Sequence, residues 1–173
     1  MLGPTIEAIL LREVAAVRRT VESYPDEASI WAERPGLPNA GGTLVLHLAG
    51  NLQHYLGAVL ARSGYRRDRD AEFARRGVPR AELLAELEAT QVAIRRGLAA
   101  LPEARLDAPY PEAIGGHQLS QRVFLVHLAS HLAYHLGQLD YHRRLVTGDR
   151  TSVGALAAAE LPSVGAPAPR LGE

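Results

Sequence analysis

Prolines constrain the fold of this chain more than any other feature of its sequence. The 173 residues include 11 prolines, yet residues 5–24, 39–78, 80–101 and 112–161 contain none. Because proline lacks a backbone N–H and clashes with the preceding turn of a helix, long helices form only inside such proline-free tracts. The chain therefore has room for four long helices.

Each proline-free tract carries the apolar periodicity of an amphipathic helix. In the first tract, apolar side chains recur at spacings of three and four from Ile6 to Tyr24, which places them on one helical face. The predicted helices cover about residues 4–24, 43–64, 79–98 and 120–148. In the third, the predicted core residues are Leu83, Leu84, Leu87, Ile94 and Leu98, and in the fourth Val123, Phe124, Leu128, Leu132, Leu139 and Leu145.

The helix ends carry local signals of their own. Pro4 suits a first helical turn, and Thr43 and Ser120 belong to the residue types that cap helix N-termini. Gly148 is a usual left-handed terminator for the fourth helix. These signals support the four predicted helices.

The expected fold class is all-α, a four-helix bundle over residues 1–150. Helices that each have one apolar face bury those faces best by packing side by side. No long stretch alternates apolar and polar residues, so the only β-structure expected is a short hairpin within residues 106–118. Residues 151–173, rich in Ala, Pro and Gly, form a tail with room for one short helix.

Composition excludes several classes of chemistry and of partner. The chain has no cysteine, and all 19 of its basic residues are arginine, so thiolate nucleophiles, disulfides and Schiff-base lysines are excluded. A formal net charge of zero provides no overall attraction for nucleic acid or an anionic membrane. No segment approaches the roughly 18 consecutive apolar residues of a membrane span. We therefore expect a soluble, cytoplasmic protein that binds neither nucleic acid nor membrane.

The clearest functional signal is the placement of the histidines. Six of the seven lie on the second and fourth predicted helices. They are His47, His54, His127, His131, His135 and His142. At 100° per residue, the four on the fourth helix fall within an arc of roughly 80°, which lines one helix face with imidazoles.

A divalent cation is the simplest explanation for this column of imidazoles. Burying unpaired imidazoles costs free energy, and protonating neighbouring rings adds repulsion. Histidines four residues apart in this column can direct their nitrogens to one ion, and His47 is the best donor from the facing helix. The alternative is a hydrogen-bonded polar core, and His54 and His142 fit ordinary core histidines.

Two other kinds of metal site do not match the sequence. A zincin has glutamate directly after its first histidine, whereas the segments here read HLASH and HLAYH. A di-iron bundle needs Glu-x-x-His on two helices, and neither histidine-bearing helix supplies it. A mononuclear histidine site remains.

The segment from His127 to Gln138, HLASHLAYHLGQ, resembles the signature of the DinB-like (DinB/YfiT) metal-binding superfamily. The segment LHLAGN around His47 is similar to the first-histidine motif of that superfamily. One uncharacterised branch resembles the chain further on, at Arg67, Arg69, Asp70, Glu72 and Phe73. Members first described as DNA-damage-inducible have no demonstrated reaction.

The resemblance implies a four-helix bundle, often a homodimer, whose divalent metal is held by His47, His131 and His135. It also implies an activity, because characterised relatives include transferases and isomerases that use the low-molecular-weight thiols bacillithiol or mycothiol. Zinc is the first expectation for the metal, and nickel, iron, manganese or cobalt are alternatives. The expected partner is a small-molecule substrate.

Further residues receive expected roles around this site. His127 is the fallback catalytic base, and Asn51 and Gln138, one turn from ligands, are placed to orient a bound water, a cofactor or a histidine. Arg67 and Arg69 are candidates to hold a carboxylate of a thiol cofactor or substrate. Alternatively, Asn51 and Gln138 only bridge helices, and the charged stretch 64–77 is a solvated loop. Tyr134 is expected in the core between helices.

The functional hypothesis is a metal-dependent enzyme that activates a low-molecular-weight thiol near neutral pH for attack on a small electrophile. One alternative is a metal-dependent hydrolase, in which water replaces the thiol. The other is a noncatalytic bundle, stabilised by metal or binding a ligand.

Overall fold

The computed structural model describes residues 1–162, and its body is formed by four long helices. They are α1 (Leu2–Glu22), α3 (Gly41–Leu52), α5 (Arg80–Ala99) and α6 (Gln121–Thr147). The rod of α3 continues directly into a π-helix, η1 (Gln53–Leu60). The predicted all-α bundle is confirmed, with helix bounds close to the predicted ones.

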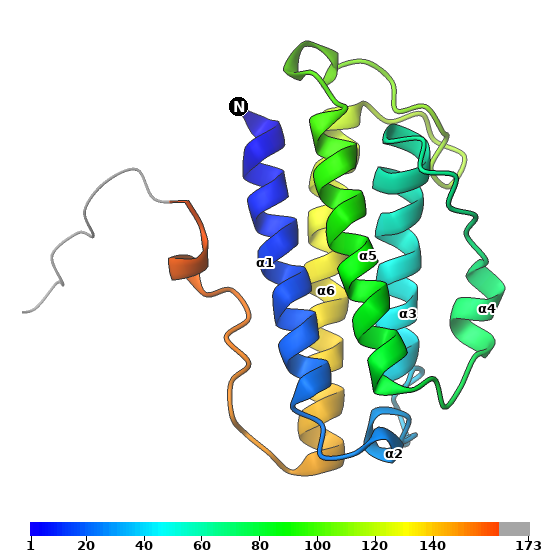
Figure 1. Ribbon diagram of the computed structural model, residues 1–173, viewed down its shortest axis with the longest axis vertical. Helices are drawn as coiled ribbons and strands as arrows, with labels where there is room; N and C mark the ends of the chain where they lie inside the picture. The colour runs from blue at the N-terminus through cyan, green and yellow to red at the C-terminus, as the bar shows by residue number, and fades with distance from the viewer. Residues whose placement is uncertain (163–173) are drawn as a thin grey trace, which may run out of the picture.

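The four long helices surround one core, and each has two long neighbours (Figure 1). Helix α1 packs against α5 and α6, and α3 packs against the same two helices from the other side. Helices α3 and α6 are therefore adjacent, although 68 residues separate the end of one from the start of the other. This adjacency brings their histidines together.

Short elements cover the ends and one side of the bundle. Helix α2 (Glu27–Ile30) packs on α6, and α4 (Arg69–Ala74), which the sequence did not predict, packs on the outside of α3 (Figure 1). Single turns of 3₁₀-helix lie at Glu103–Arg105 and Ala158–Glu160. Bridges pair Pro109 with Ser120 and Ile114 with His117, which is all the β-structure present in residues 1–162. None of the helices described is long and apolar enough to cross a bilayer.

The predicted apolar faces form the core, with exceptions on α6. Ile6, Leu10, Val14 and Val17 of α1 are all buried, as the spacing predicts. On α6 the predicted core leucines are buried, except Leu145 near the end of the helix. The exposed fraction is 53% for Val123, 59% for Leu145 and 65% for Tyr134. The core assignment of these three was wrong, because the outward face of α6 has no long helix against it.

The predicted caps hold at α6 but not at α3. The Ser120 hydroxyl accepts a hydrogen bond from the Val123 N–H at 3.3 Å, and Gly148 ends the helix with a φ of 72°. Thr43 is not a cap, since α3 begins two residues earlier at Gly41 and Thr43 is buried inside it. Glycine at 42 permits this early start, because any Cβ there would overlap the ring of Trp31.

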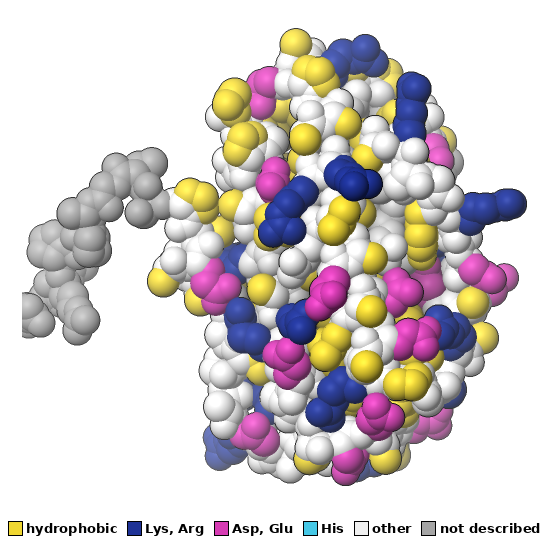
Figure 2. All heavy atoms as spheres, viewed as in Figure 1, with side chains coloured by type: hydrophobic (Ala, Val, Ile, Leu, Met, Phe, Trp, Pro, Cys, Tyr) yellow, Lys and Arg dark blue, Asp and Glu magenta, His cyan; other side chains and the backbone are white. Residues whose placement is uncertain are grey.

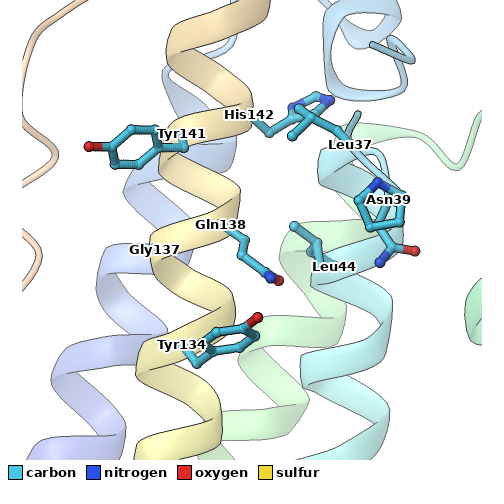
Figure 3. A pocket seen from close by; sticks show the side chains of 9 residues that line it. Leu37, Asn39, Leu44, Tyr134, Gly137, Gln138, Tyr141 and His142 are labelled. Atoms are coloured by element: carbon cyan, nitrogen blue, oxygen red, sulfur yellow. The ribbon is translucent and has the colours of Figure 1, made fainter. Parts of the chain in front are cut away.

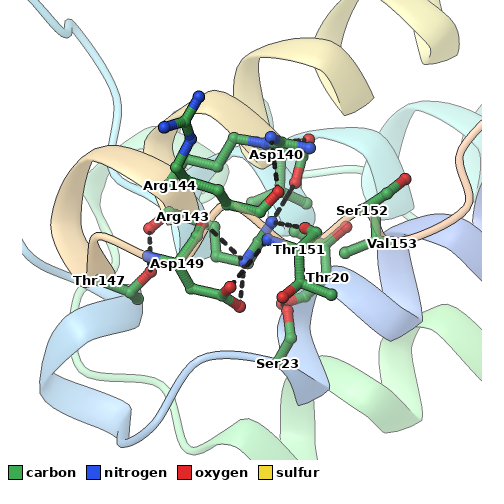
Figure 4. A network of polar contacts seen from close by, with 12 residues as sticks. Thr20, Ser23, Asp140, Arg143, Arg144, Thr147, Asp149, Thr151, Ser152 and Val153 are labelled. Carbon is green, nitrogen blue, oxygen red and sulfur yellow. Dashed lines mark hydrogen bonds and ion pairs between the residues drawn. The ribbon is translucent and has the colours of Figure 1, made fainter.

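A fully buried arginine fastens the last part of the described chain to α6 (Figure 4). The guanidinium of Arg143 donates to the carboxylates of Asp140 and Asp149, and to the Thr151 carbonyl at 2.6 Å. Arg19 of α1 donates to the Val153 carbonyl at 2.8 Å. The first part of the predicted tail is thus held in place, and residues 163–173 lie outside the described part.

Charged side chains are distributed without a field of one sign on the face drawn in Figure 2. Arginine and acidic side chains alternate there with apolar ones. That distribution agrees with the formal net charge of zero.

Replacing Arg143 with methionine tests the importance of the buried anchor. The variant leaves the Thr151 carbonyl and one oxygen of Asp140 without their buried donor, so we expect the free energy of unfolding to fall by roughly 2 kcal/mol in urea denaturation. Arg144→Met is the matched control, because Arg144 also binds Asp140 but is one-third exposed, and we expect a loss below about 1 kcal/mol. Equal losses in the two variants would show that the buried anchor has no special role.

Candidate metal centre

Three imidazoles from α3 and α6 converge on one point. His47 comes from α3, and His131 and His135 come from successive turns of α6. One nitrogen from each ring lies within 4.8 Å of the other two. The closest pair is Nε2 of His47 and Nε2 of His131, at 3.2 Å. The three residues predicted as metal ligands are therefore brought together.

A buried carboxylate fixes the orientation of His47. Its Nδ1 lies 3.0 Å from Oε2 of Glu72, whose exposed fraction is only 7%. Arg67 binds the same carboxylate through two nitrogens, at 2.6 and 2.9 Å. Because the nearest partner of Nδ1 is a carboxylate, Nδ1 carries the hydrogen and Nε2 keeps its lone pair for the cluster.

The electrostatics of Glu72 favour its charged form. Burial opposes that form, but the hydrogen bonds from Arg67 and His47 outweigh burial and lower the pKa of the Glu72 carboxyl. The ring of Phe73 packs on His47, with centroids 4.9 Å apart. Carboxylate and ring together leave His47 little freedom to rotate.

Local structure explains how a residue of a highly charged segment reaches α3. Asp68 caps α4 by accepting a hydrogen bond from the Ala71 N–H at 2.9 Å, which starts the short helix. Gly50, one turn beyond His47, provides the space, since a Cβ there would overlap the Glu72 carboxylate. The interpretation of residues 64–77 as a solvated loop is therefore wrong at Arg67 and Glu72.

On α6, a neutral amide orients His135. The Nδ1–H of His135 donates to Oε1 of Gln138 at 2.7 Å, which leaves Nε2 with its lone pair. Burial lowers the pKa of His135, partly offset by this hydrogen bond. Burial, with the neighbouring His135 and His47, lowers the pKa of His131 to about 4. His131 and His135 are thus neutral at pH 7, the state in which imidazole binds metal.

This donor set fits a divalent cation. Two lone pairs at 3.2 Å repel each other unless a proton or a cation lies between them. A tetrahedral ion with nitrogen ligands at 2.0–2.1 Å requires nitrogens about 3.4 Å apart, close to the His47–His131 separation. Three neutral nitrogens satisfy the ion and leave at least one coordination position for another ligand.

Comparison with known proteins gives the family. The family model of the DinB superfamily matches residues 9–139, which include α3, α4, α5 and the three histidines. The chain belongs to the DinB superfamily. No curated protein and no solved structure matches it significantly. The resemblance to the DinB superfamily is thereby confirmed, and the superfamily is metal-binding.

The remaining residues singled out in this DinB-superfamily chain lie around the cluster or away from it. His127 is exposed, with its ring centroid 6.2 Å from that of His131. Asn51 is buried one turn beyond His47, and its Oδ1 accepts no hydrogen bond within the described residues. The guanidinium of Arg69 stacks over Phe73 at 5.0 Å. Gln138 and Arg67 contact His135 and Glu72, as described above.

Two histidines take no part in the cluster. His54 lies on η1 and binds Glu112 at 3.0 Å near the surface. His142 is buried, with Nδ1 2.7 Å from the Tyr24 hydroxyl and Nε2 2.8 Å from the Ala32 carbonyl. Both nitrogens of His142 are satisfied, and burial lowers its pKa. It is the ordinary core histidine that the sequence allowed.

Sequence reasoning gave Glu72 no role in the site, although one signal pointed to it. Gly50 interrupts an apolar helix three residues after His47, so both lie on one face. A glycine inside a helix often marks the close approach of another segment. The approaching segment is α4, and the residue that fills the space is Glu72.

Gly50→Ala tests whether that space holds Glu72 against His47. The new methyl group must displace the carboxylate, so His47 loses the partner that keeps its hydrogen on Nδ1. In the ¹⁵N shifts of the imidazole nitrogens, we expect a single Nδ1–H tautomer in the parent protein and a mixture in the variant, measured without metal. Gly137→Ala is the control, because a Cβ at this α6 glycine meets nothing within 4 Å. An unchanged His47 tautomer in Gly50→Ala would refute the steric argument.

Proposed function

We propose that this protein is a divalent-metal-dependent enzyme that transfers a low-molecular-weight thiol to an electrophilic small molecule. The observation that carries the proposal is the convergence of three imidazole nitrogens within 4.8 Å between α3 and α6. Zinc fits this donor set first, and nickel, iron, manganese or cobalt are alternatives. The small-molecule partner and the homodimer stay predictions.

A divalent cation at three histidines would supply Lewis acidity, which lowers the pKa of a coordinated thiol or water. In the transfer, the thiol sulfur bonds to the electrophilic carbon, and the leaving group departs with the bonding electron pair. The thiol proton passes to solvent or to the leaving group. No redox partner is needed.

The protein's own residues have supporting roles in this proposal. Glu72, held by Arg67, keeps His47 in the tautomer that directs Nε2 to the centre. Gln138 does the same for His135 without adding charge. The centre thus has one neutral orienting group on α6, Gln138, and one anionic orienting group on α4, Glu72, whose charge is paired with Arg67.

Three polar side chains remain for the reacting species. The buried Oδ1 of Asn51, one turn beyond His47, is free to accept a hydrogen bond from a bound thiol or water. His127, exposed beside His131, is the nearest additional imidazole that can take up a released proton. The guanidinium of Arg69 contacts Phe73 only by stacking, so its N–H groups can still bind a carboxylate of a thiol cofactor.

Metal analysis of protein produced without an affinity tag tests the site. We expect nearly one equivalent of divalent metal in the parent protein, and a loss of at least tenfold in His47→Ala, His131→Ala and His135→Ala. His54→Ala is the matched control, because His54 lies on the same rod but binds Glu112 instead. Retention of metal by His47→Ala would remove α3 from the site and overturn the proposal.

Product formation from a thiol and a chlorinated nitroaromatic electrophile tests the reaction. With bacillithiol or mycothiol, we expect the metal-loaded protein to form the thioether and release chloride, and the metal-stripped protein to lose at least tenfold in rate. The control is an activated ester without thiol. Hydrolysis of the ester with no thioether formed would identify a hydrolase, and inactivity in both assays with metal bound would favour a noncatalytic bundle.

A further inference from the structure

A groove lies one helical turn from the three histidines, along the same α3–α6 boundary (Figure 3). Leu44 of α3 lines it three residues before His47, and Gln138 of α6 lines it three residues after His135. Three residues correspond to about 4.5 Å along a helix axis. The groove therefore adjoins the candidate metal centre on both helices.

We propose that this groove binds the electrophilic substrate, and that this substrate is an uncharged small molecule with a largely apolar body. The inference rests on the proposed function and names its substrate class. The groove has a volume of about 360 Å³, within the range of small-molecule sites.

The side chains that line the groove disfavour a charged ligand. Apolar and aromatic side chains predominate, and no Asp, Glu or Arg side chain lines the groove. His142 also lines the groove, and burial lowers its pKa, which favours the uncharged imidazole. Moving an ionised carboxylate or ammonium group against such a surface costs free energy that no partner recovers. An apolar body, in contrast, gains from leaving water there.

Neutral polar groups are present where an uncharged ligand needs them. Within the described chain, no hydrogen bond engages the Tyr134 hydroxyl or the amide nitrogen of Gln138, whose Oε1 binds His135. Figure 3 shows Gln138 extending from α6 toward Leu44 of α3. A ligand in the groove thus contacts the side chain that orients a metal ligand.

Gly137 is the second observation that points to a ligand. It lies inside the longest helix, where glycine is a poor choice, and a Cβ there would meet nothing within 4 Å. Nothing in the described fold therefore requires glycine at this position. Gly137 lines the groove, and a larger side chain there would narrow it. Access for a ligand accounts for the glycine.

A matched pair of probes tests the proposal by NMR titration of the full-length protein. 2-Naphthalenemethanol is uncharged, and 2-naphthoate carries the same ring system with a negative charge. We expect the alcohol to bind at least tenfold more tightly than the carboxylate, and to shift the amide signals of Leu44, Gly137 and Gln138.

Gly137→Leu is the decisive variant, because the open space beside Gly137 can accept a leucine side chain without disturbing the helix. We expect it to weaken binding of the alcohol at least tenfold while metal content stays unchanged and the unfolding temperature does not fall, because leucine favours the helix more than glycine does. Ser130→Leu is the control, since Ser130 is exposed on the same helix and does not line the groove, and it should bind as the parent does. A lower unfolding temperature in Gly137→Leu directs the test to Gly137→Ala, for which a smaller weakening is expected.

The outcomes separate this inference from the proposed function. Equal binding of the two probes, unaltered binding by both Gly137 variants, or signal shifts elsewhere in the protein would overturn the groove assignment. Metal content, measured on the same samples, tests the metal centre independently. Bound metal without probe binding would refute the groove alone, and probe binding without metal would refute the metal centre alone.

Discussion

The approach of His47 Nε2 to within 3.2 Å of His131 Nε2 sets the requirements for everything around it. Two imidazole nitrogens at this distance in a buried place need a positive species between them and hydrogen-bond acceptors behind them. Glu72 is the acceptor behind His47, and Gln138 is the acceptor behind the third ring, His135. The position of Glu72 depends in turn on helix α4 and on a space left by Gly50.

Most of the fold was predictable from the sequence, because its determinants are local. The spacing of Leu10, Val14 and Val17 defines a helix face without knowledge of any partner, and Ser120 and Gly148 define ends by themselves. The errors arose at residues whose burial or capping role depends on which other segment packs against them. Thr43 has the chemistry of a cap but lies inside α3, and Tyr134 is apolar in pattern but faces solvent. Neither outcome follows from periodicity. Periodicity predicts an apolar face on a helix, but not which segment packs on that face.

The site was predictable to a smaller extent, for a similar reason. Spacings of four residues on one helix predict that the histidine rings point the same way, and His47 was the best donor on the facing helix; the resemblance then selected His131 and His135. Glu72 was quoted in that resemblance but was given no role, because its segment has the composition of solvated surface. Whether a carboxylate in such a segment is buried depends on a contact across 25 residues, His47 to Glu72, and on the register between α4 and α3. Sequence patterns of short range contain no information on that register.

The two sides of the imidazole cluster differ in how easily they can be rearranged. On the α4 side, Glu72 is charged, buried and bound to Arg67 by two hydrogen bonds, so displacing it would leave ions unpaired in the interior. On the α6 side, Gln138 is neutral and half-buried, and its amide nitrogen is uncommitted within the described residues. Rotating a neutral amide costs far less than breaking a buried ion pair. A ligand that has to enter and leave therefore meets the lower barrier on the α6 side. Gln138 on that side also lines the apolar groove, whereas Glu72 and Phe73 on the α4 side hold His47 in place.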